Sequence, residues 1–129
     1  MGMIKSDREL AISKKKIQEM KDYKHHTCKG IKDHVVDSFK MQIQDEIKEY
    51  ERIKKGNIPA YFFDFDNIGL LLIALRIKNG LTQTDLANKL EVPPSQVSRD
   101  ENNDYHGVSS VTIKKILKVL NEKIAIKLV

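Results

Sequence analysis

Polar side chains suited to reading DNA bases cluster in a short segment of the second half of the chain, at Ser95, Gln96, Ser98 and Arg99. Arginine can bond O6 and N7 of a guanine together, whereas glutamine and serine can serve adenine or accept several bases. We expect Ser95 and Arg99 to be the main base contacts, with Gln96 and Ser98 next. Pro94 precedes them and has no side-chain donor, so it can at most touch a thymine methyl group.

Two short helices joined by a tight turn, over residues 81–102, are predicted to position these side chains. Thr82 can cap the first helix, because its hydroxyl can accept a hydrogen bond from an N–H one turn on. Leu86 and Leu90 lie four residues apart and give this helix an apolar face. Pro94 suits the first turn of the second helix, where its missing N–H costs nothing. Helices at this spacing form a helix-turn-helix, whose second helix fits a DNA major groove.

The same segment resembles the helix-turn-helix of the Cro/CI (XRE) family of phage and bacterial repressors. The family opens its first motif helix with a glutamine, matched by Gln83, and closes the recognition helix with S-R-x-E-N, matched by residues 98–102. The small and apolar positions of the pattern are filled by Leu86, Ala87, Leu90, Val92 and Val97. The resemblance covers about residues 64–121 and implies a lambda-repressor-like domain.

The resemblance also implies roles outside the recognition helix. Arg76 is expected to pair with Glu101, tying the first helix of the domain to the third, so we assign both residues to structure. Asn102 matches a phosphate-contacting asparagine. In the loop that follows, Tyr105 and His106 either contact the phosphates as well or cover the edge of the core. Thr82 and Gln83, at a helix N-terminus with free N–H groups, would bind another phosphate.

Two positions depart from the family pattern. Glu91 stands where the family usually has a glycine, in left-handed backbone that costs another residue about 1 kcal/mol. Asp100 stands where the family usually has an apolar residue, so it is either exposed at the helix end or partnered by Tyr105 or His106. We expect the fold to tolerate both departures.

The first half of the chain is predicted to form two helices. Ser6 can cap a short turn over residues 7–11, and Ser13, the better candidate, can cap a helix over residues 14–24. A long helix is expected over residues 31–55, because apolar residues recur at three- and four-residue spacing along about 36 Å. They are Ile31, Val35, Val36, Phe39, Ile43, Ile47, Tyr50 and Ile53. The shorter helix covers part of this stripe, and the remainder needs either a second copy of the chain or packing within one chain.

The chain is therefore expected to be mainly all-α and to have three parts. Residues 1–58 form an N-terminal helical hairpin, residues 59–121 the DNA-binding domain, and residues 122–129 a short β-strand. The strand is predicted from the alternation of apolar and other residues after Asn121. It would pair with residues 60–63 or with a second subunit, and we favour the second subunit because a palindromic operator needs a two-fold dimer.

Bulk properties limit the class of protein. Because Cys28 is the only cysteine, no disulfide can form within the chain, and this fits a protein of the reducing cytoplasm. We expect no membrane span and no signal peptide, since no long apolar run is present. His25, His26 and Cys28 are too few for a structural zinc site, so no metal or cofactor is expected. No phosphate loop or catalytic constellation stands out, and we expect no enzyme.

Charge permits nucleic-acid binding without proving it. The net charge is +5, but residues 59–129 hold 9 Lys and Arg against 8 Asp and Glu. Most of the positive excess lies in residues 1–58, which hold 14 Lys and Arg against 10 Asp and Glu. Lysines there, such as Lys14, Lys15 and Lys16, either face solvent or add contacts to DNA phosphates.

Two functions follow from these observations. The first is a DNA-binding transcriptional regulator, a repressor acting as a dimer on double-stranded DNA in the cytoplasm. The alternative is an antitoxin or adaptor whose N-terminal helices hold a partner protein. Residues 6–9 and 49–51 are similar to a subset of XRE-type regulators, some of them antitoxin-like, in which two N-terminal helices precede the DNA-binding domain.

Overall fold

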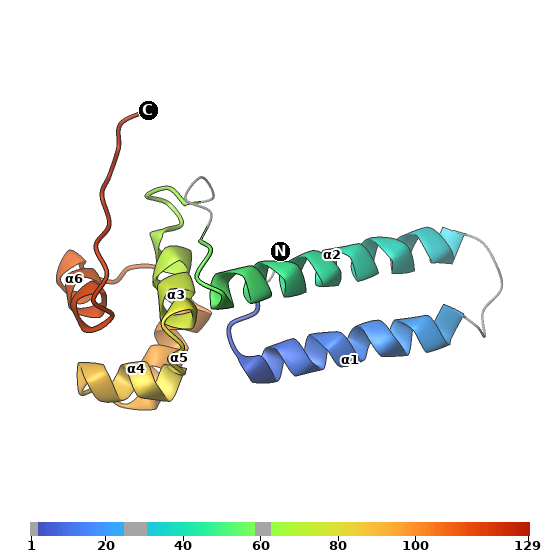
Figure 1. Cartoon of the computed structure of the whole chain (residues 1–129), viewed down its shortest axis with the longest axis horizontal. Helices are drawn as coiled ribbons and strands as arrows, with labels where there is room; N and C mark the ends of the chain where they lie inside the picture. Colours follow the sequence, from blue (N-terminus) through green and yellow to red (C-terminus); the bar gives the residue numbers. More distant parts are fainter. Residues whose placement is uncertain (1–2, 25–30, 59–62) are drawn as a thin grey trace. The chain divides into compact units, whose positions relative to one another are not determined.

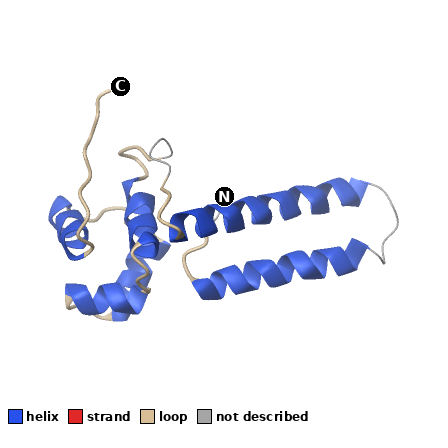
Figure 2. Cartoon of the chain, in the orientation of Figure 1, coloured by secondary structure: helices blue, strands red, loops and turns tan. Residues whose placement is uncertain are grey.

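The computed structural model describes residues 3–24, 31–58 and 63–129. These residues form six α-helices and no β-strand (Figures 1 and 2). The chain divides into two compact units, Met1–Arg52 and Ile53–Val129. No helix in the described ranges is both long and apolar enough to cross a membrane. The candidate metal ligands His25, His26 and Cys28 lie outside the described residues.

The first unit is a hairpin of two long helices, α1 (Asp7–Lys24) and α2 (Ile31–Lys54). α1 begins after Ser6, whose Oγ accepts the Glu9 N–H at 3.2 Å, while the Glu9 carboxylate accepts the Lys5 N–H at 2.8 Å. Our prediction that Ser13 opens this helix is wrong. Ser6 has a glutamate three residues on, so side chains satisfy two N–H groups at that end, and Ser13 lies inside the helix.

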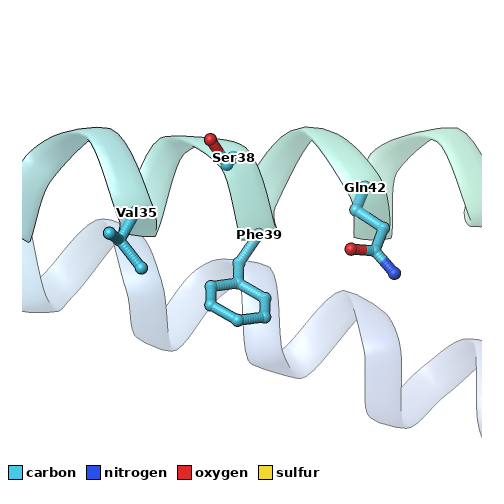
Figure 3. Close-up of a pocket in the computed structure, with 4 residues that line it drawn as sticks. All are labelled: Val35, Ser38, Phe39 and Gln42. Atoms are coloured by element: carbon cyan, nitrogen blue, oxygen red, sulfur yellow. The ribbon is translucent and has the colours of Figure 1, made fainter. Parts of the chain in front are cut away.

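The two helices of the hairpin are joined by polar contacts. Tyr50 Oη donates to Asp7 Oδ1 at 2.8 Å, and Lys14 Nζ lies 3.2 Å from Glu51 Oε1. The long helix was predicted over 31–55, and α2 occupies nearly all of that range. Its apolar stripe is buried towards the C-terminal end of the helix, at Ile47, Tyr50 and Ile53, whereas Val35 and Phe39 (Figure 3) are 50% and 56% exposed.

The second unit contains α3 (Ile68–Lys78), α4 (Gln83–Leu90), α5 (Pro94–Asn102) and α6 (Ser110–Val119). α4 packs against α5 and α6, and α3 packs against α6. The buried apolar side chains of these helices and their connections are Leu72, Ile73, Ala74, Leu75, Ile77, Leu86, Ala87, Val97, Tyr105, Ile116 and Leu120. Helical spacing over residues 110–120 predicts Val111 on the core face of α6. It is 57% exposed, because it lies in the first turn of α6, at the edge of the core.

α3 starts later than predicted. The sequence predicts a helix over residues 65–79 with Asp64 as its cap and Asn67 reaching back to it. The two residues do bond reciprocally: the Asp64 N–H donates to Asn67 Oδ1 and the Asn67 N–H to Asp64 Oδ1. These bonds close a turn before the helix instead of its first turn, and Asn67 is the N-cap residue. Phe65 is consequently left in the turn, 73% exposed.

All four helices of the second unit end in the same way. One residue at each end is in left-handed backbone. Gly80, Asp104 and Asn121 directly follow the C-caps of α3, α5 and α6, with φ of 71°, 51° and 54°, and Glu91 is itself the C-cap of α4, with φ of 59°. The N–H of this left-handed residue bonds the carbonyl three residues back, and the next N–H bonds the carbonyl five residues back, which is a Schellman motif. The left-handed backbone predicted at Glu91 is confirmed. So is that of Gly80, which the sequence predicts as the residue that ends the helix before it. The sequence predicts Asn121 as the C-cap of the last helix, but it lies one residue beyond the C-cap, Leu120.

The predicted C-terminal strand is wrong. Residues 123–129 carry no regular secondary structure, and Ile126 and Leu128 are 75% and 93% exposed. A strand needs a second strand to satisfy its backbone N–H and C=O groups, and nothing in the described part of the chain supplies one. The alternation of apolar residues alone was therefore an insufficient signal.

Candidate nucleic-acid interface

A buried ion pair lies behind α5. Arg76 Nε lies 2.6 Å from Glu101 Oε1, and Arg76 Nη2 donates to Glu101 Oε2 at 3.1 Å. The side chains are 3% and 0% exposed. Arg76 Nη1 also donates to the Leu81 carbonyl at 2.8 Å. The bidentate pair thus joins α3 to α5 and fixes the start of the α3–α4 turn.

The same carboxylate holds the first residue of α4. Gln83 Nε2 donates to Glu101 Oε2 at 2.6 Å. The structure thereby brings together three of the predicted residues, Arg76, Gln83 and Glu101. Their network connects α3, α4 and α5 through one carboxylate, so the orientation of α5 depends on buried groups as well as on apolar packing.

The N-terminus of α4 is closed by a capping box. Thr82 Oγ1 accepts the Asp85 N–H at 3.1 Å, and the Asp85 carboxylate accepts the Thr82 N–H at 2.9 Å. The hydrogen bond that the Thr82 backbone N–H donates to the Asp85 carboxylate, with the Thr82 side chain as the second cause, holds the pKa of Asp85 below its usual value. Thr82 was predicted as the cap, whereas Asp85 was missed, although T-x-x-D before an apolar run is a readable signal.

The capping box leaves fewer free N–H groups for the phosphate that was expected at this helix end. It occupies the N–H groups of Thr82 and Asp85 and places a carboxylate at the helix end. The N–H groups of Gln83 and Thr84 make no hydrogen bond to another described residue. A phosphate at this end would therefore be held by these two N–H groups and the Thr82 hydroxyl.

The exposed face of α5 carries the predicted base contacts. Ser95, Gln96 and Arg99 are exposed, Ser98 is half-buried, and Val97 faces the core at 2% exposure. The Arg99 Nε donates to the Ser95 carbonyl at 3.3 Å, one turn earlier in the helix. The terminal guanidinium nitrogens of Arg99 make no hydrogen bond to a described residue, so they can bind another molecule.

The two ends of α5 differ. Pro94 is the first helical residue, after Pro93 as N-cap, so this end has neither a side-chain cap nor a polar base reader. Asn102, the last helical residue, is exposed, as a phosphate contact must be. Asp100 is half-buried and its backbone carbonyl accepts the Tyr105 N–H at 2.7 Å.

Tyr105 does not occupy the surface that a phosphate contact requires. Its side chain is buried, with 6% exposure. Burial of the phenol is the main cause that raises the pKa of Tyr105 above its ordinary value, and the negative charge of Glu101 is the second cause. This placement fits the alternative that the aromatic ring covers the edge of the core, and we correct the expectation that it lies along the DNA. His106, next to it, is exposed.

The surface of the motif is not strongly basic. Lys89 and Arg99 are exposed, but so are Asp85 and Glu91, and Asp100 is half-buried. No group of three or more metal-binding side chains lies together among the described residues. Hydrogen-bond donors on α5, rather than charge, are therefore what this face can offer to a ligand.

Comparison with known proteins agrees with this geometry. Residues 72–126 match a family model described as a helix-turn-helix. The match begins in α3 and includes α4, α5 and α6. No curated protein and no solved structure matches the chain.

Proposed function

We propose, because residues 72–126 belong to the Cro/CI-type helix-turn-helix family, that the protein is a sequence-specific transcriptional regulator. It binds double-stranded DNA as a dimer and acts as a repressor. α5 enters the major groove and α4 rests its N-terminus against the backbone. Residues 59–121 form the DNA-binding domain and residues 1–58 a helical hairpin with a separate role.

The exposed row of donors on α5 carries this proposal. Ser95 and Arg99 lie one turn apart, and the buried Glu101 network holds the helix from behind. Arg99 would read a guanine, Ser95, Gln96 and Ser98 would be more permissive, and Pro94 could touch only a thymine methyl. Asn102 and Thr82 would contact phosphates. We expect modest direct readout per half-site, so that two half-sites are needed for specificity.

Selection of bound sequences from a random DNA pool tests the proposal. The expected result is a site with two-fold symmetry and half-sites about 34 Å apart, bound less tightly as salt rises. Arg99→Ala should lose about 1–3 kcal/mol of binding free energy and relax preference at one position per half-site. Lys114→Ala removes an exposed cation from α6 and serves as the control, with base preference unchanged. Absence of DNA binding at low ionic strength would reject the proposal.

The charge balance of the motif favours a second candidate, a protein-binding antitoxin or adaptor. Asp85 and Glu91 are exposed beside the proposed DNA face and would repel phosphates. In that case the N-terminal hairpin would hold a partner protein and the helix-turn-helix would bind DNA weakly. A toxin encoded by the neighbouring gene, and a stable complex with it on gel filtration, would favour this function.

A further inference from the structure

Asn79 and Gly80, at the end of α3, form a dipeptide that can undergo a chemical modification without an enzyme. Of the seven asparagines in the chain, only Asn79 is followed by a glycine. An asparagine loses its side-chain amide when the backbone nitrogen of the next residue attacks the side-chain carbonyl carbon, and this makes asparagine a thermolabile residue. Glycine favours the attack, because it has no Cβ to shield its nitrogen and its backbone rotates freely. The sequence therefore marks Asn79 as the asparagine with the greatest intrinsic tendency to deamidate.

This deamidation needs only water. The Gly80 nitrogen forms a bond to Cγ of Asn79 and gives up its proton, and the side-chain nitrogen of Asn79 leaves as ammonia. Water then opens the resulting cyclic imide at one of its two carbonyls. One product is aspartate, and the other is isoaspartate, in which the main chain runs through the former side chain. Both products carry a carboxylate, ionised at neutral pH, where Asn79 had a neutral amide.

The folded chain holds both reacting groups in hydrogen bonds. Asn79 Nδ2 donates to the Leu75 carbonyl at 2.7 Å and to Glu122 Oε1 at 3.2 Å. The first of these bonds turns the side chain back towards the preceding turn of α3. The Gly80 N–H donates to the Ile77 carbonyl at 3.0 Å, within the turn that ends the helix. Formation of the imide therefore requires the end of α3 to open locally, as helix ends do when they fray.

We propose that Asn79 is a deamidation site and that its contact with Glu122 limits the rate of the reaction in the folded chain. Glu122 follows α6 and is held by Lys78, whose Nζ lies 2.9 Å from the same Oε1 atom. One carboxylate at the end of α6 thus restrains the reactive amide at the end of α3. Asn79 is exposed, so water reaches the imide once it has formed. The inference does not depend on DNA binding and goes beyond the proposed function.

Deamidation changes the contact between the ends of α3 and α6. An aspartate at position 79 lacks the donor that bonds Leu75 and Glu122, and its carboxylate repels that of Glu122. Isoaspartate in addition lengthens the main chain directly before Gly80, whose left-handed backbone, with φ of 71°, begins the connection to α4. A chain modified at this position is therefore less stable than a fresh chain.

Peptide mapping of the full chain by mass spectrometry, after incubation at mildly alkaline pH, tests the proposal. In the chain unfolded in guanidinium chloride, Asn79 should deamidate faster than the other asparagines, and in the folded chain it should react more slowly. Glu122→Ala should accelerate the reaction of the folded chain about fivefold, the factor that one ordinary hydrogen bond represents. Val97→Ala is the matched control, because it destabilises the same unit from the buried side of α5 and leaves the end of α3 unchanged. Its deamidation rate should equal that of the wild type.

The reaction product can also be made directly by substitution. Asn79→Asp should melt a few degrees below Asn79→Ala, which loses the same amide without gaining a charge, and high salt should narrow the difference. Circular dichroism checks that each variant folds, and Lys78→Met, which releases Glu122, replaces Glu122→Ala if that chain does not fold.

Four results would overturn the proposal. They are an Asn79 no faster than the other asparagines in the unfolded chain, equal rates in the folded and unfolded chains, a rate unchanged by Glu122→Ala, and equal melting temperatures of Asn79→Asp and Asn79→Ala. Acceleration by Val97→Ala as large as that by Glu122→Ala would overturn it too, because the reaction would then follow unfolding of the whole unit.

Discussion

Gln83, the first residue of α4, donates from Nε2 to Oε2 of Glu101 in α5, at 2.6 Å. The amide that the family pattern would place against a phosphate is thus also bound to the carboxylate that anchors α5. Glu101 accepts at the same time from Arg76. A phosphate at the α4 N-terminus and the orientation of α5 are therefore linked through one side chain.

Gln83→Ala is expected to lower both stability and DNA affinity. The substitution removes a hydrogen bond to a buried carboxylate, for which we expect a loss of about 1.5–3 kcal/mol in the free energy of unfolding. DNA affinity should fall alike for all sequences, because no base contact is lost. Urea unfolding and gel shifts on specific and random DNA measure the two effects. Gln96→Ala, at an exposed position of α5, should leave stability unchanged; equal stability of both variants would contradict the role of Gln83.

Removing one partner of the Arg76–Glu101 pair is expected to lower the free energy of unfolding more than replacing both partners with apolar residues. Arg76→Ala leaves the buried Glu101 charge without its main partner, and we expect a loss of about 3–5 kcal/mol. The double variant Arg76→Met with Glu101→Met removes both charges and should be more stable than the single variant. Urea unfolding of the two proteins measures the difference. An Arg76→Ala protein as stable as the wild type would show that the pair does not hold α3 to α5.

Local signals were sufficient where one residue type meets one backbone requirement. Thr82 caps α4, and Gly80 provides left-handed backbone. They failed where two signals competed or a distant partner was needed. Ser6 and Ser13 compete as caps, and Ser6 is distinguished by Glu9 three residues on, whose N–H bonds the Ser6 hydroxyl and whose carboxylate accepts the Lys5 N–H. The C-terminal alternation suggested a strand, but strand formation depends on a partner that local sequence does not reveal.

In the candidate site too, features set by local sequence were predicted and features that depend on distant residues were not. The outward residues of α5 follow from helical spacing about Val97, which is buried as expected. Arg76 and Glu101 are 25 residues apart, so their pairing came only from the family resemblance. The contact of Gln83 with Glu101 was not predicted, because a helix-terminal glutamine carries no sequence signal for a buried carboxylate. Tyr105 had two open placements, and only the packed core separates them.

Gly69 is expected to be indispensable for the packing of α3. A Cβ built at this position would overlap the backbone carbonyl of Asp104, with Tyr105 Cβ also close. Glycine to alanine inside a helix usually stabilises by about 0.5–1 kcal/mol. Here the backbone after α5 would have to move, and we expect Gly69→Ala to lose about 1–3 kcal/mol instead. Thermal melting reads the sign directly: an increase in melting temperature would show that the loop yields without cost.

The link between Lys78 and Glu122 is expected to make stability depend on pH. Lys78 Nζ lies 2.9 Å from Glu122 Oε1, and Asn79 Nδ2 donates to the same oxygen at 3.2 Å. The hydrogen bond from Lys78, with that from Asn79, holds the pKa of Glu122 below its usual value. A carboxyl group with a lowered pKa in the folded state stabilises the fold above its unfolded pKa, and this contribution is lost as pH falls through the folded pKa.

Glu122→Gln should therefore melt at a lower temperature than the wild type at neutral pH, because the contact between the ends of α3 and α6 loses its charge. The difference should shrink as pH falls below the usual range of a glutamate pKa, and it should also shrink in high salt, since the pair is partly exposed. Asp66→Asn, at an exposed position in the turn before α3, serves as the control with no such pattern. A difference in melting temperature that stays constant from neutral to acidic pH would mean that the carboxylate charge does not join the two helix ends.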